Sequence, residues 1–288
     1  MAVPLPWYAK ISAKIVLSRL PIPYSFWRGI GLFRNGAMDK ADYSIQIFSQ
    51  HVQNAFEHLN LSGKTVLELG SGDSVASAII AASAGAEKIY LVDVGAFATR
   101  DMSFYVQLVQ ELTKRDGFTP PTITSDMSFE QMLEACNAEY LTDGLNSLKS
   151  IDTSSVDFIW SHSCLEHVRK HEFDATMSEL WRILADNGQV SHSIDLQDHL
   201  EHSLNNLRFS ENFWESKFMV RSGFYTNRLR ASDYENSFAK SGFQVGKWNE
   251  GKWSDIPLPR QKMHKDFCER SERDLLVRTI STNLKKAA

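Results

Sequence analysis

The feature that most constrains the fold of this chain is a pair of apolar strands. The first runs into a glycine turn, and the second, about twenty residues later, ends in an acid. The first strand, residues 65–69, is β-branched and aliphatic, which suits burial on both faces of a parallel sheet. Gly70 and Gly72 let the backbone turn tightly and approach a ligand. The second strand, residues 88–93, ends at Asp93. The spacing predicts a βαβ unit with a ligand site where both strands end.

The residues around the turn discriminate between two classes of ligand. Residues 74–84 are small and alanine-rich, and they predict a helix whose first amides point at the ligand. A dinucleotide-binding turn requires a third glycine, but Val75 occupies that position. Glu68 would also place an anion beside a pyrophosphate, whereas a cationic ligand would tolerate it. The pattern therefore favours a cationic cofactor over a nicotinamide dinucleotide.

The same residues resemble a known family. Residues 68–74 read Glu-Leu-Gly-Ser-Gly-Asp-Ser, which resembles motif I of class I S-adenosylmethionine-dependent methyltransferases, with Asp93 as the acid of the second motif. Ser74 stands where the motif usually carries a third glycine. Asp143 and Gly144 close the third strand, where adenine usually sits in this family. The resemblance implies S-adenosylmethionine as the cofactor. The residues predicted to bind it are Glu68, Gly70, Ser71, Gly72, Asp93, Asp143, Gly144 and Ser161.

The resemblance continues along the chain. Residues 155–168 are similar to the fourth strand and following helix of the family, where Leu-Glu-His is common. Residues 179–189 are similar to the helix and turn before its fifth strand, with turn chemistry supplied by Asp-Asn-Gly at 186–188. The matched region, residues 61–195, implies an α/β fold. Its sheet would be Rossmann-like, seven-stranded and mostly parallel, with helices on both faces and an N-terminal helical cap.

Hydrophobic periodicity and turn residues predict alternating helices and strands. Helices are predicted near residues 41–59, 74–84, 101–115 and 129–137, and strands at 65–69, 88–93, 138–142, 156–160 and 190–194. The last two strands are predicted at residues 243–247 and 275–282, which in the resembled family form an antiparallel edge pair. We assign residues 1–60 to the cap and residues 61–288 to the methyltransferase domain, with a substrate-binding insertion around residues 196–240.

Composition indicates an ordinary enzyme rather than a nucleic-acid or membrane-spanning protein. The 288 residues are 43% hydrophobic, enough for one large core, and the net charge of −4 gives no reason to expect nucleic acid as a partner. The cysteines are scattered, without Cys-x-x-Cys spacing, which indicates reduced thiols and a cytoplasmic location. No uninterrupted apolar stretch of about eighteen residues predicts a spanning helix.

The N-terminal residues 1–38 are basic and aromatic, with five cations and no acid. Such a segment can pack as a helical cap over the catalytic domain, or it can lie on an anionic membrane surface. We favour the cap and keep peripheral membrane association as the alternative. Pro21 and Pro23 divide the segment into two pieces, and Lys10 and Lys14 interrupt any apolar core of a secretory signal.

The loops after the fourth and fifth strands carry many titratable groups, at the sheet edge where α/β proteins bind ligands. These groups are His162, Glu166, His167, His192, Asp195, Asp198 and His199, with Ser161 beside them. Methyl transfer to oxygen or nitrogen requires an oriented and often deprotonated acceptor. We predict His199 as the base, with Asp195 or Asp198 fixing its tautomer, and His162 as a third catalytic group. The alternative is that His199 is an ordinary surface histidine.

Glu166 and His167 also raise the question of a metal. In ubiquinone-type O-methyltransferases and small-RNA end methyltransferases, a similar Glu-x-x-Glu-His segment binds a divalent cation, but Ser163 replaces the first glutamate here. Residues 163–166 instead predict a capping box, in which Ser163 caps a helix and Glu166 reaches back to its first amide. We therefore predict no metal. His192 alternates with apolar strand residues and is predicted to be a buried sheet histidine.

Residues 206–230 combine aromatic side chains with guanidinium and amide groups. This mixture suits a polar or anionic acceptor such as a sugar, a carboxylate or a phosphorylated carrier, unless Arg228 and Arg230 are simply solvated. The segment also resembles, less specifically, bacterial methyltransferases that accompany surface-glycan enzymes. We predict a methyltransferase that acts on an oxygen or nitrogen of a small-molecule or glycan acceptor. The alternatives are a nicotinamide-dependent dehydrogenase and a noncatalytic scaffold of the same fold.

Overall fold

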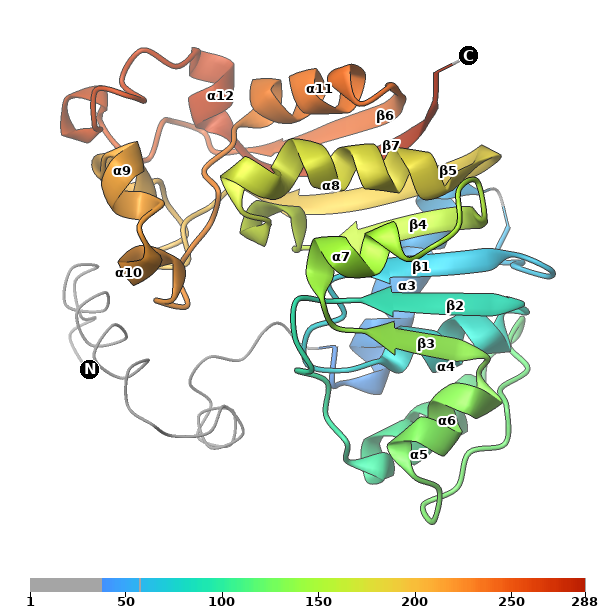
Figure 1. The fold of residues 1–288 in the computed structure, drawn as a ribbon. Helices are drawn as coiled ribbons and strands as arrows, with labels where there is room; N and C mark the ends of the chain where they lie inside the picture. Colours follow the sequence, from blue (N-terminus) through green and yellow to red (C-terminus); the bar gives the residue numbers. More distant parts are fainter. Residues whose placement is uncertain (1–37, 57, 288) are drawn as a thin grey trace, which may run out of the picture.

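The computed structural model describes residues 38–56 and 58–287 of the chain. The predictions made for residues 1–37, a helical cap or a membrane-surface segment, lie outside these residues. One seven-stranded sheet crosses the molecule, with helices on both faces (Figure 1). Its strand order is β3-β2-β1-β4-β5-β7-β6, and β7 runs antiparallel to both of its neighbours. The predicted Rossmann-like, mostly parallel sheet is therefore confirmed.

The strands are β1 (Thr65–Leu69), β2 (Lys88–Val92), β3 (Ala138–Leu141), β4 (Val156–His162), β5 (Leu184–Asp195), β6 (Phe243–Lys252) and β7 (Val277–Lys286). The α-helices are α3 (Ala41–Ala55), α4 (Ala76–Ser83), α5 (Met102–Leu112), α6 (Phe129–Ala135), α7 (Gly144–Lys149), α8 (Lys170–Ile183), α9 (Glu211–Trp214), α10 (Lys217–Val220), α11 (Ala231–Lys240) and α12 (Glu272–Leu276). Three 3-10 turns are η1 (Leu165–His167), η2 (Asn205–Arg208) and η3 (Arg260–Lys262).

The turn predicted at residues 186–188 lies within β5 rather than before it: a Cβ on Gly188 would be 2.9 Å from the Ala185 carbonyl oxygen, so the chain doubles back here. Strand β5 begins at Leu184, directly after α8, and continues through these residues. The register between β4 and β5 shifts between Val156 and Phe158, where the partner changes from Leu184 to Gln189. Strand β5 therefore carries extra residues at this point, and they form an irregularity in the β4–β5 ladder.

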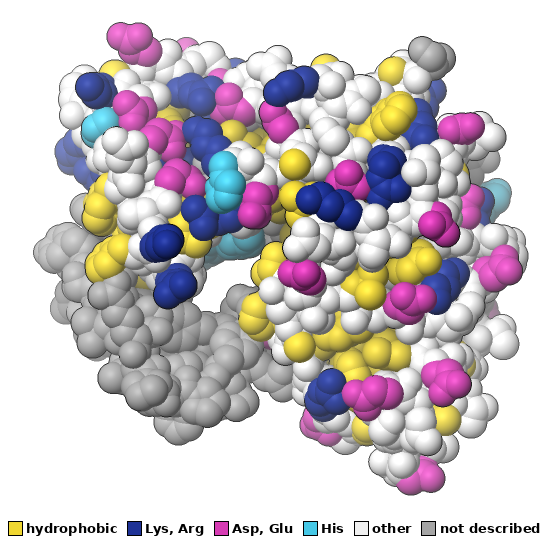
Figure 2. Space-filling view, viewed as in Figure 1, with side chains coloured by type: hydrophobic (Ala, Val, Ile, Leu, Met, Phe, Trp, Pro, Cys, Tyr) yellow, Lys and Arg dark blue, Asp and Glu magenta, His cyan; other side chains and the backbone are white. Residues whose placement is uncertain are grey.

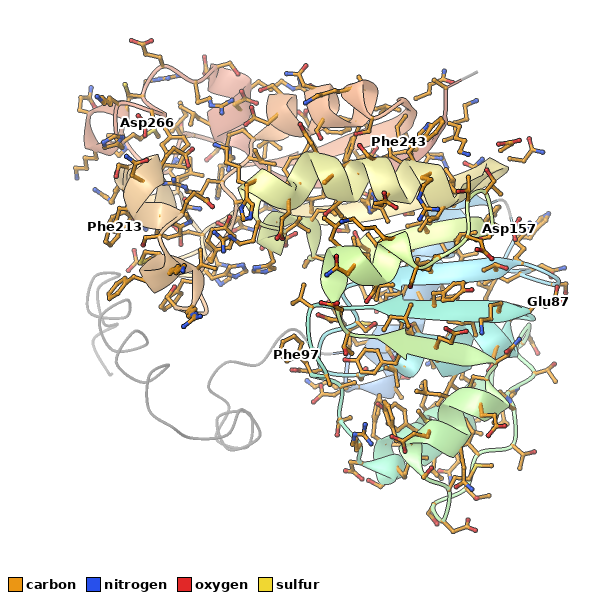
Figure 3. The ribbon with its side chains drawn as sticks, in the orientation of Figure 1. Glu87, Phe97, Asp157, Phe213, Phe243 and Asp266 are labelled. Atoms are coloured by element: carbon orange, nitrogen blue, oxygen red, sulfur yellow. The ribbon has the colours of Figure 1, made fainter. Side chains whose placement is uncertain are left out.

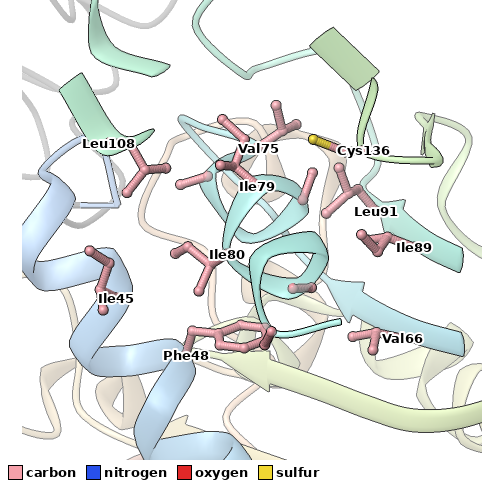
Figure 4. Close-up of a cluster of buried hydrophobic side chains, with 14 of the residues drawn as sticks. Ile45, Phe48, Val66, Val75, Ile79, Ile80, Ile89, Leu91, Leu108 and Cys136 are labelled. Carbon is pink, nitrogen blue, oxygen red and sulfur yellow. The ribbon is translucent and has the colours of Figure 1, made fainter. Parts of the chain in front are cut away.

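Each face of the sheet carries its own hydrophobic core. On one face α3 and α4 pack on β1 and β4, with Phe48 and Ile80 fully buried between them (Figure 4). On the other face α8 and α11 pack on β4 and β5, around Leu180 and Tyr234. Helix α3 is therefore part of the core of the sheet domain, although the predicted domain boundary lies at residue 60.

Residues 198–229 and 253–275 form an accessory layer beyond the ends of β4 and β5 (Figure 1). Leu207 from the first segment and Phe267 from the second share one buried cluster, and the His264 amide donates to the Leu207 carbonyl at 2.8 Å. The predicted insertion covers only the first segment. Of the helices within the described residues, none combines the length and apolar character needed to cross a bilayer.

Candidate active site

Asp93 is the centre of the predicted cofactor site. Its carboxylate accepts hydrogen bonds from the Gly72 amide, at 2.8 Å, and from the Val94 amide, at 2.7 Å. Its carbonyl oxygen accepts a hydrogen bond from the Gly144 amide at 2.8 Å. The Gly70 amide donates to the Val92 carbonyl at 2.7 Å. Three segments that are far apart in the sequence therefore meet at the carboxyl ends of β1, β2 and β3.

Gly70 could not be replaced without displacing its neighbours. Its φ is +84°, a left-handed conformation that favours glycine. A Cβ at this position would also lie 2.6 Å from the Cβ of Cys164, in the segment after β4. The glycine therefore lets the β1 turn contact the chain that follows β4, which joins the cofactor edge to the neighbouring strand end.

Glu68 lies beneath the turn rather than beside it. Its side chain is almost completely buried and accepts a hydrogen bond from the Ser77 hydroxyl of α4. Burial raises the pKa of Glu68 to about 8, so the carboxyl is largely protonated at neutral pH. The charge argument against a pyrophosphate made from the sequence therefore loses its force. Ser71 is also buried, whereas Asp143 is exposed at the start of α7.

The side chains of Ser161 and His192 contact each other inside the sheet. Ser161 Oγ lies 2.8 Å from His192 Nδ1, both residues are fully buried, and the imidazole stacks on Phe238 of α11. Burial lowers the pKa of His192 to about 3, so the ring is neutral. His192 lies in the sheet as predicted, but it is not the fully satisfied histidine expected, because its Nε2 has no hydrogen-bond partner among the described residues. The predicted cofactor contact of Ser161 stays a prediction, but its hydroxyl is engaged with His192.

The capping box predicted at residues 163–166 is wrong. The segment forms the 3-10 turn η1 without a side-chain cap, and Ser163 has a φ of +49°. Glu166 points inward, only 1% exposed, and its Oε1 accepts a hydrogen bond from the Asp195 amide at 3.2 Å. Burial raises the pKa of Glu166 to about 8. Contact with the end of β5 has therefore replaced the local cap.

His199 lies against a second histidine, His167. Their rings stack with centroids 5.0 Å apart. His167 Nδ1 donates to the Tyr225 carbonyl at 2.9 Å, because a carbonyl can only accept, and this leaves Nε2 as an acceptor. His167 keeps solvent-accessible surface, yet desolvation and the nearby His199 lower its pKa to about 4. In the space-filling view, histidine side chains are among those exposed over the accessory layer (Figure 2).

The two aspartates predicted to orient His199 organise the loop around it. Asp198 Oδ1 accepts from the amides of Leu200 and Glu201, and its Oδ2 accepts from the Asn205 amide. Asp195 Oδ1 accepts from the amide two residues further along the chain, at 2.9 Å. Among residues 38–56 and 58–287, no group of three or more metal-ligating side chains is placed to hold a metal ion.

Arg228 and Arg230 are structural, contrary to both interpretations of the sequence. Arg230 is completely buried and donates to the carbonyls of Leu196, Asp274 and Val277. Arg228 is 3% exposed, donates to two carbonyls of the accessory layer and to Glu211, and lies over two aromatic rings. Neither guanidinium is solvated or left over for an anionic acceptor. Their partners are backbone carbonyls of remote segments and, for Arg228, also Glu211, which no local pattern predicts.

Sequence reasoning missed two residues of α3 that reach the same edge. The Tyr43 hydroxyl and His51 Nε2 lie 3.5 Å and 3.3 Å from the two ring nitrogens of His162. Both residues lie in a predicted amphipathic helix, where a tyrosine and a histidine carry no signal of function. Only the packing of α3 against β4 and β5 brings them together.

The fold and the site define the class of protein. Two features are typical of the Rossmann-like methyltransferase fold. One is the strand order with a single reversed strand, and the other is the glycine turn after β1 together with the acid after β2. The family described as methyltransferase domain matches residues 43–247, which is most of the chain. The chain therefore belongs to this family, and it is an S-adenosylmethionine-dependent methyltransferase. The dehydrogenase interpretation is set aside.

Several solved structures are similar to this chain. One is an S-adenosylmethionine-dependent methyltransferase from Mesorhizobium loti, at 13% identity and a TM-score of 0.44, covering 79% of this chain and 93% of that chain. Another is geranyl diphosphate C-methyltransferase from Streptomyces coelicolor, at 14% identity and a TM-score of 0.48, covering 84% and 80%. A third is 1,6-didemethyltoxoflavin-N1-methyltransferase from Burkholderia thailandensis, at 10% and 0.46, covering 100% and 94%. A search of curated proteins finds no match.

Proposed function

We propose that this methyltransferase transfers its methyl group to an oxygen or nitrogen atom of a small-molecule or glycan acceptor. One observation carries the proposal: the glycine turns that meet at Asp93 and the histidines after β4 and β5 occupy neighbouring strand ends of one sheet. The cofactor would then lie over β1 to β3, and the acceptor over β4 and β5. In open α/β sheets, ligands bind outside the carboxyl ends of the strands.

The residues on the cofactor side fit S-adenosylmethionine. An ionised carboxylate can accept about four hydrogen bonds, and Asp93 uses two for backbone amides, which leaves capacity for two ribose hydroxyls. Val94 beside it is 77% exposed and offers apolar surface to a base. At the same edge, Gly70, Gly72 and Gly144 have no side chain that could obstruct the cofactor. When bound, the cofactor supplies an electrophilic methyl group on a sulfonium.

The residues on the acceptor side supply proton-accepting groups. We propose His162 and His199 as the two candidates for the base that removes a proton from the acceptor. Asp195 lies at the same edge, at the end of β5. Burial lowers the pKa of His162, so its ring is neutral and able to accept a proton at pH 7. Because Arg228 and Arg230 are committed to the fold, they do not support an anionic acceptor. A cytoplasmic location and membrane contact through residues 1–38 stay predictions.

Calorimetric titration of the purified protein with S-adenosylhomocysteine, with NAD and NADP run alongside, tests the cofactor. We expect binding of S-adenosylhomocysteine alone. Binding of a nicotinamide instead, or of none of the three, would refute the proposal. A screen of sugars, hydroxylated aromatics and amines for release of S-adenosylhomocysteine then tests turnover. Cofactor binding without release against any acceptor class would favour the noncatalytic scaffold.

A further inference from the structure

The hydrogen bonds at this edge fix the protonation of a third histidine, His167. Its Nδ1 lies 2.9 Å from the Tyr225 carbonyl oxygen. A carbonyl has no proton to give, so Nδ1 of the neutral ring carries the proton and Nε2 carries a lone pair. The ring stacks on His199 with 18° between the two planes. Because a stack covers the face of a ring, the lone pair, which lies in the ring plane, stays open.

The turn that carries His167 is held in place by Asn227, which is fully buried. The side-chain and backbone amides of Asn227 donate to three carbonyls of the turn, those of Leu165 at 2.8 Å, Val168 at 3.1 Å and Glu166 at 2.7 Å. Tyr225 and Asn227 belong to one segment, so the same stretch of chain fixes both the turn and the imidazole. Such a fixed position is required of a catalytic group, since a misplacement of about 1 Å can lower a rate about a hundredfold.

The same turn borders the proposed cofactor site. A Cβ on Gly70 would lie 2.6 Å from the Cβ of Cys164, and the His167 amide donates to the Cys164 carbonyl at 2.8 Å. On the other side, Asp195 at the end of β5 acts on the imidazole by charge interaction. The His167 side chain is exposed. The imidazole therefore lies between the glycine turn and the end of β5, where an acceptor can reach it.

We infer that His167 is the catalytic base and that its Nε2 removes the proton of the acceptor group. This inference rests on the proposed function and deepens it. The acceptor atom forms its bond to the methyl carbon as the carbon–sulfur bond of the cofactor breaks, and the sulfur keeps the bonding electron pair. The proton of the acceptor passes to His167 Nε2. The resulting imidazolium donates from Nδ1 to the Tyr225 carbonyl until the proton leaves to solvent.

The surroundings of His167 keep its lone pair available. Desolvation and the nearby His199 lower the pKa of His167 to about 4, so the ring is neutral at pH 7. A base this weak is sufficient for an oxygen acceptor, because a hydroxyl group that binds a methyl carbon develops positive charge and becomes strongly acidic. Asp195 favours the imidazolium once the proton has been transferred, whereas His199 opposes it.

The hydrogen bonds around His162 favour a different role for that residue. The Asn54 side-chain amide donates to the Thr282 carbonyl at 3.2 Å and to Ser191 Oγ at 3.1 Å. Among the described residues, the acceptor that remains for the Ser191 hydroxyl proton is His51 Nδ1, at 2.8 Å. His51 then donates from Nε2 to His162 Nδ1, at 3.3 Å, which places the ring proton of His162 on its Nε2. His162 would therefore donate a hydrogen bond at this edge rather than remove a proton.

Replacing His167 by asparagine separates a base from a structural residue. The asparagine NH2 group can replace Nδ1 as the donor to the Tyr225 carbonyl, so His167→Asn should fold and bind S-adenosylhomocysteine as the wild type does. The variant lacks a basic nitrogen, and with an acceptor from the screen we expect kcat to fall at least about a hundredfold. A purely structural role would leave kcat normal. His167→Gln serves as a second variant should the asparagine variant not fold.

The pH dependence of the variant provides a second test. With a hydroxylated aromatic acceptor, activity of His167→Asn should recover at high pH, where the hydroxyl ionises without a base. A loss that persists at high pH, with normal binding of S-adenosylhomocysteine, would contradict the role of a base. Nitrogen-15 NMR of the full-length protein needs no acceptor, and it should show a protonated Nδ1 and an unprotonated Nε2 for His167 at pH 7.5. An Nε2–H form would overturn the inference.

His171→Asn is the matched control. His171 is also exposed and lies four residues further along the chain, but its Nε2 interacts with Glu172 at 3.6 Å, and no carbonyl fixes its ring. This variant should leave kcat unchanged. Normal kcat in His167→Asn, or a loss confined to His162→Gln, would refute the inference while leaving the methyltransferase assignment intact. Absence of S-adenosylhomocysteine binding by the wild type would instead refute the proposed function.

Discussion

Replacing Asp93 by asparagine tests the cofactor site directly. In the wild type, the carboxylate accepts the amides of Gly72 and Val94 at 2.8 and 2.7 Å. Asparagine keeps one acceptor oxygen, and its NH2 group would face an amide N–H, so one of these two hydrogen bonds is lost. A hydrogen bond to a charged group contributes about 1.5–3 kcal/mol. The turn that carries Gly72 should therefore lose its fixed position.

The expected result is weaker binding of S-adenosylhomocysteine in Asp93→Asn, by about 1–3 kcal/mol. Since about 1.4 kcal/mol corresponds to a factor of ten, the dissociation constant should rise roughly fivefold to more than a hundredfold. Calorimetric titration at 25 °C measures it. Affinity equal to that of the wild type would remove Asp93 from the site and refute the reasoning.

Asp157→Ala is the control for this experiment, because alanine removes the acceptor. Asp157 Oδ2 accepts the Thr65 amide at 2.8 Å, at the start of β1. The same kind of hydrogen bond is thus lost at the opposite end of the sheet, far from Phe97 and the carboxyl ends of the strands (Figure 3). This variant should lose stability in denaturation but bind S-adenosylhomocysteine normally. Equal loss of affinity in both variants would mean that the effect of Asp93→Asn comes from general destabilisation.

Three further predictions follow from the buried groups. Gly70→Ala should destabilise the fold by about 1–3 kcal/mol in urea denaturation, because the left-handed φ and the contact with Cys164 both oppose a Cβ. In the folded protein, burial raises the pKa of Glu166 to about 8 from its ordinary value of 4.5. The folded state then binds more protons, so stability falls as pH rises between these values, by up to about 1.4 kcal/mol per pH unit; Glu166→Gln should flatten that decline, and an unchanged slope would contradict it. Arg230→Met should cost about 3 kcal/mol or more because it leaves buried carbonyls without donors, whereas the exposed Arg100→Met should cost almost nothing.

The sequence by itself determined the proposed cofactor half of this protein. A buried strand, a glycine turn and an acid after the next strand are local features, and the handedness of βαβ units places them at one edge. Strand β1 has the predicted bounds, and Gly72 and Gly144 both hydrogen-bond to Asp93. Local chemistry was sufficient here because each element needs only its own residues and its neighbour in the sequence.

Only the tertiary structure decided the proposed acceptor half. Glu166 accepts from an amide of β5 instead of forming a local cap, and Arg230 is buried and donates to three carbonyls of two distant segments. His51 contacts His162 across 111 positions of sequence. Burial makes an unpaired polar group costly, so such groups take whatever partner the packing brings within reach. Sequence spacing predicts the partners of adjacent elements, but partners of this kind are known only once the helices and the accessory layer are packed on the sheet.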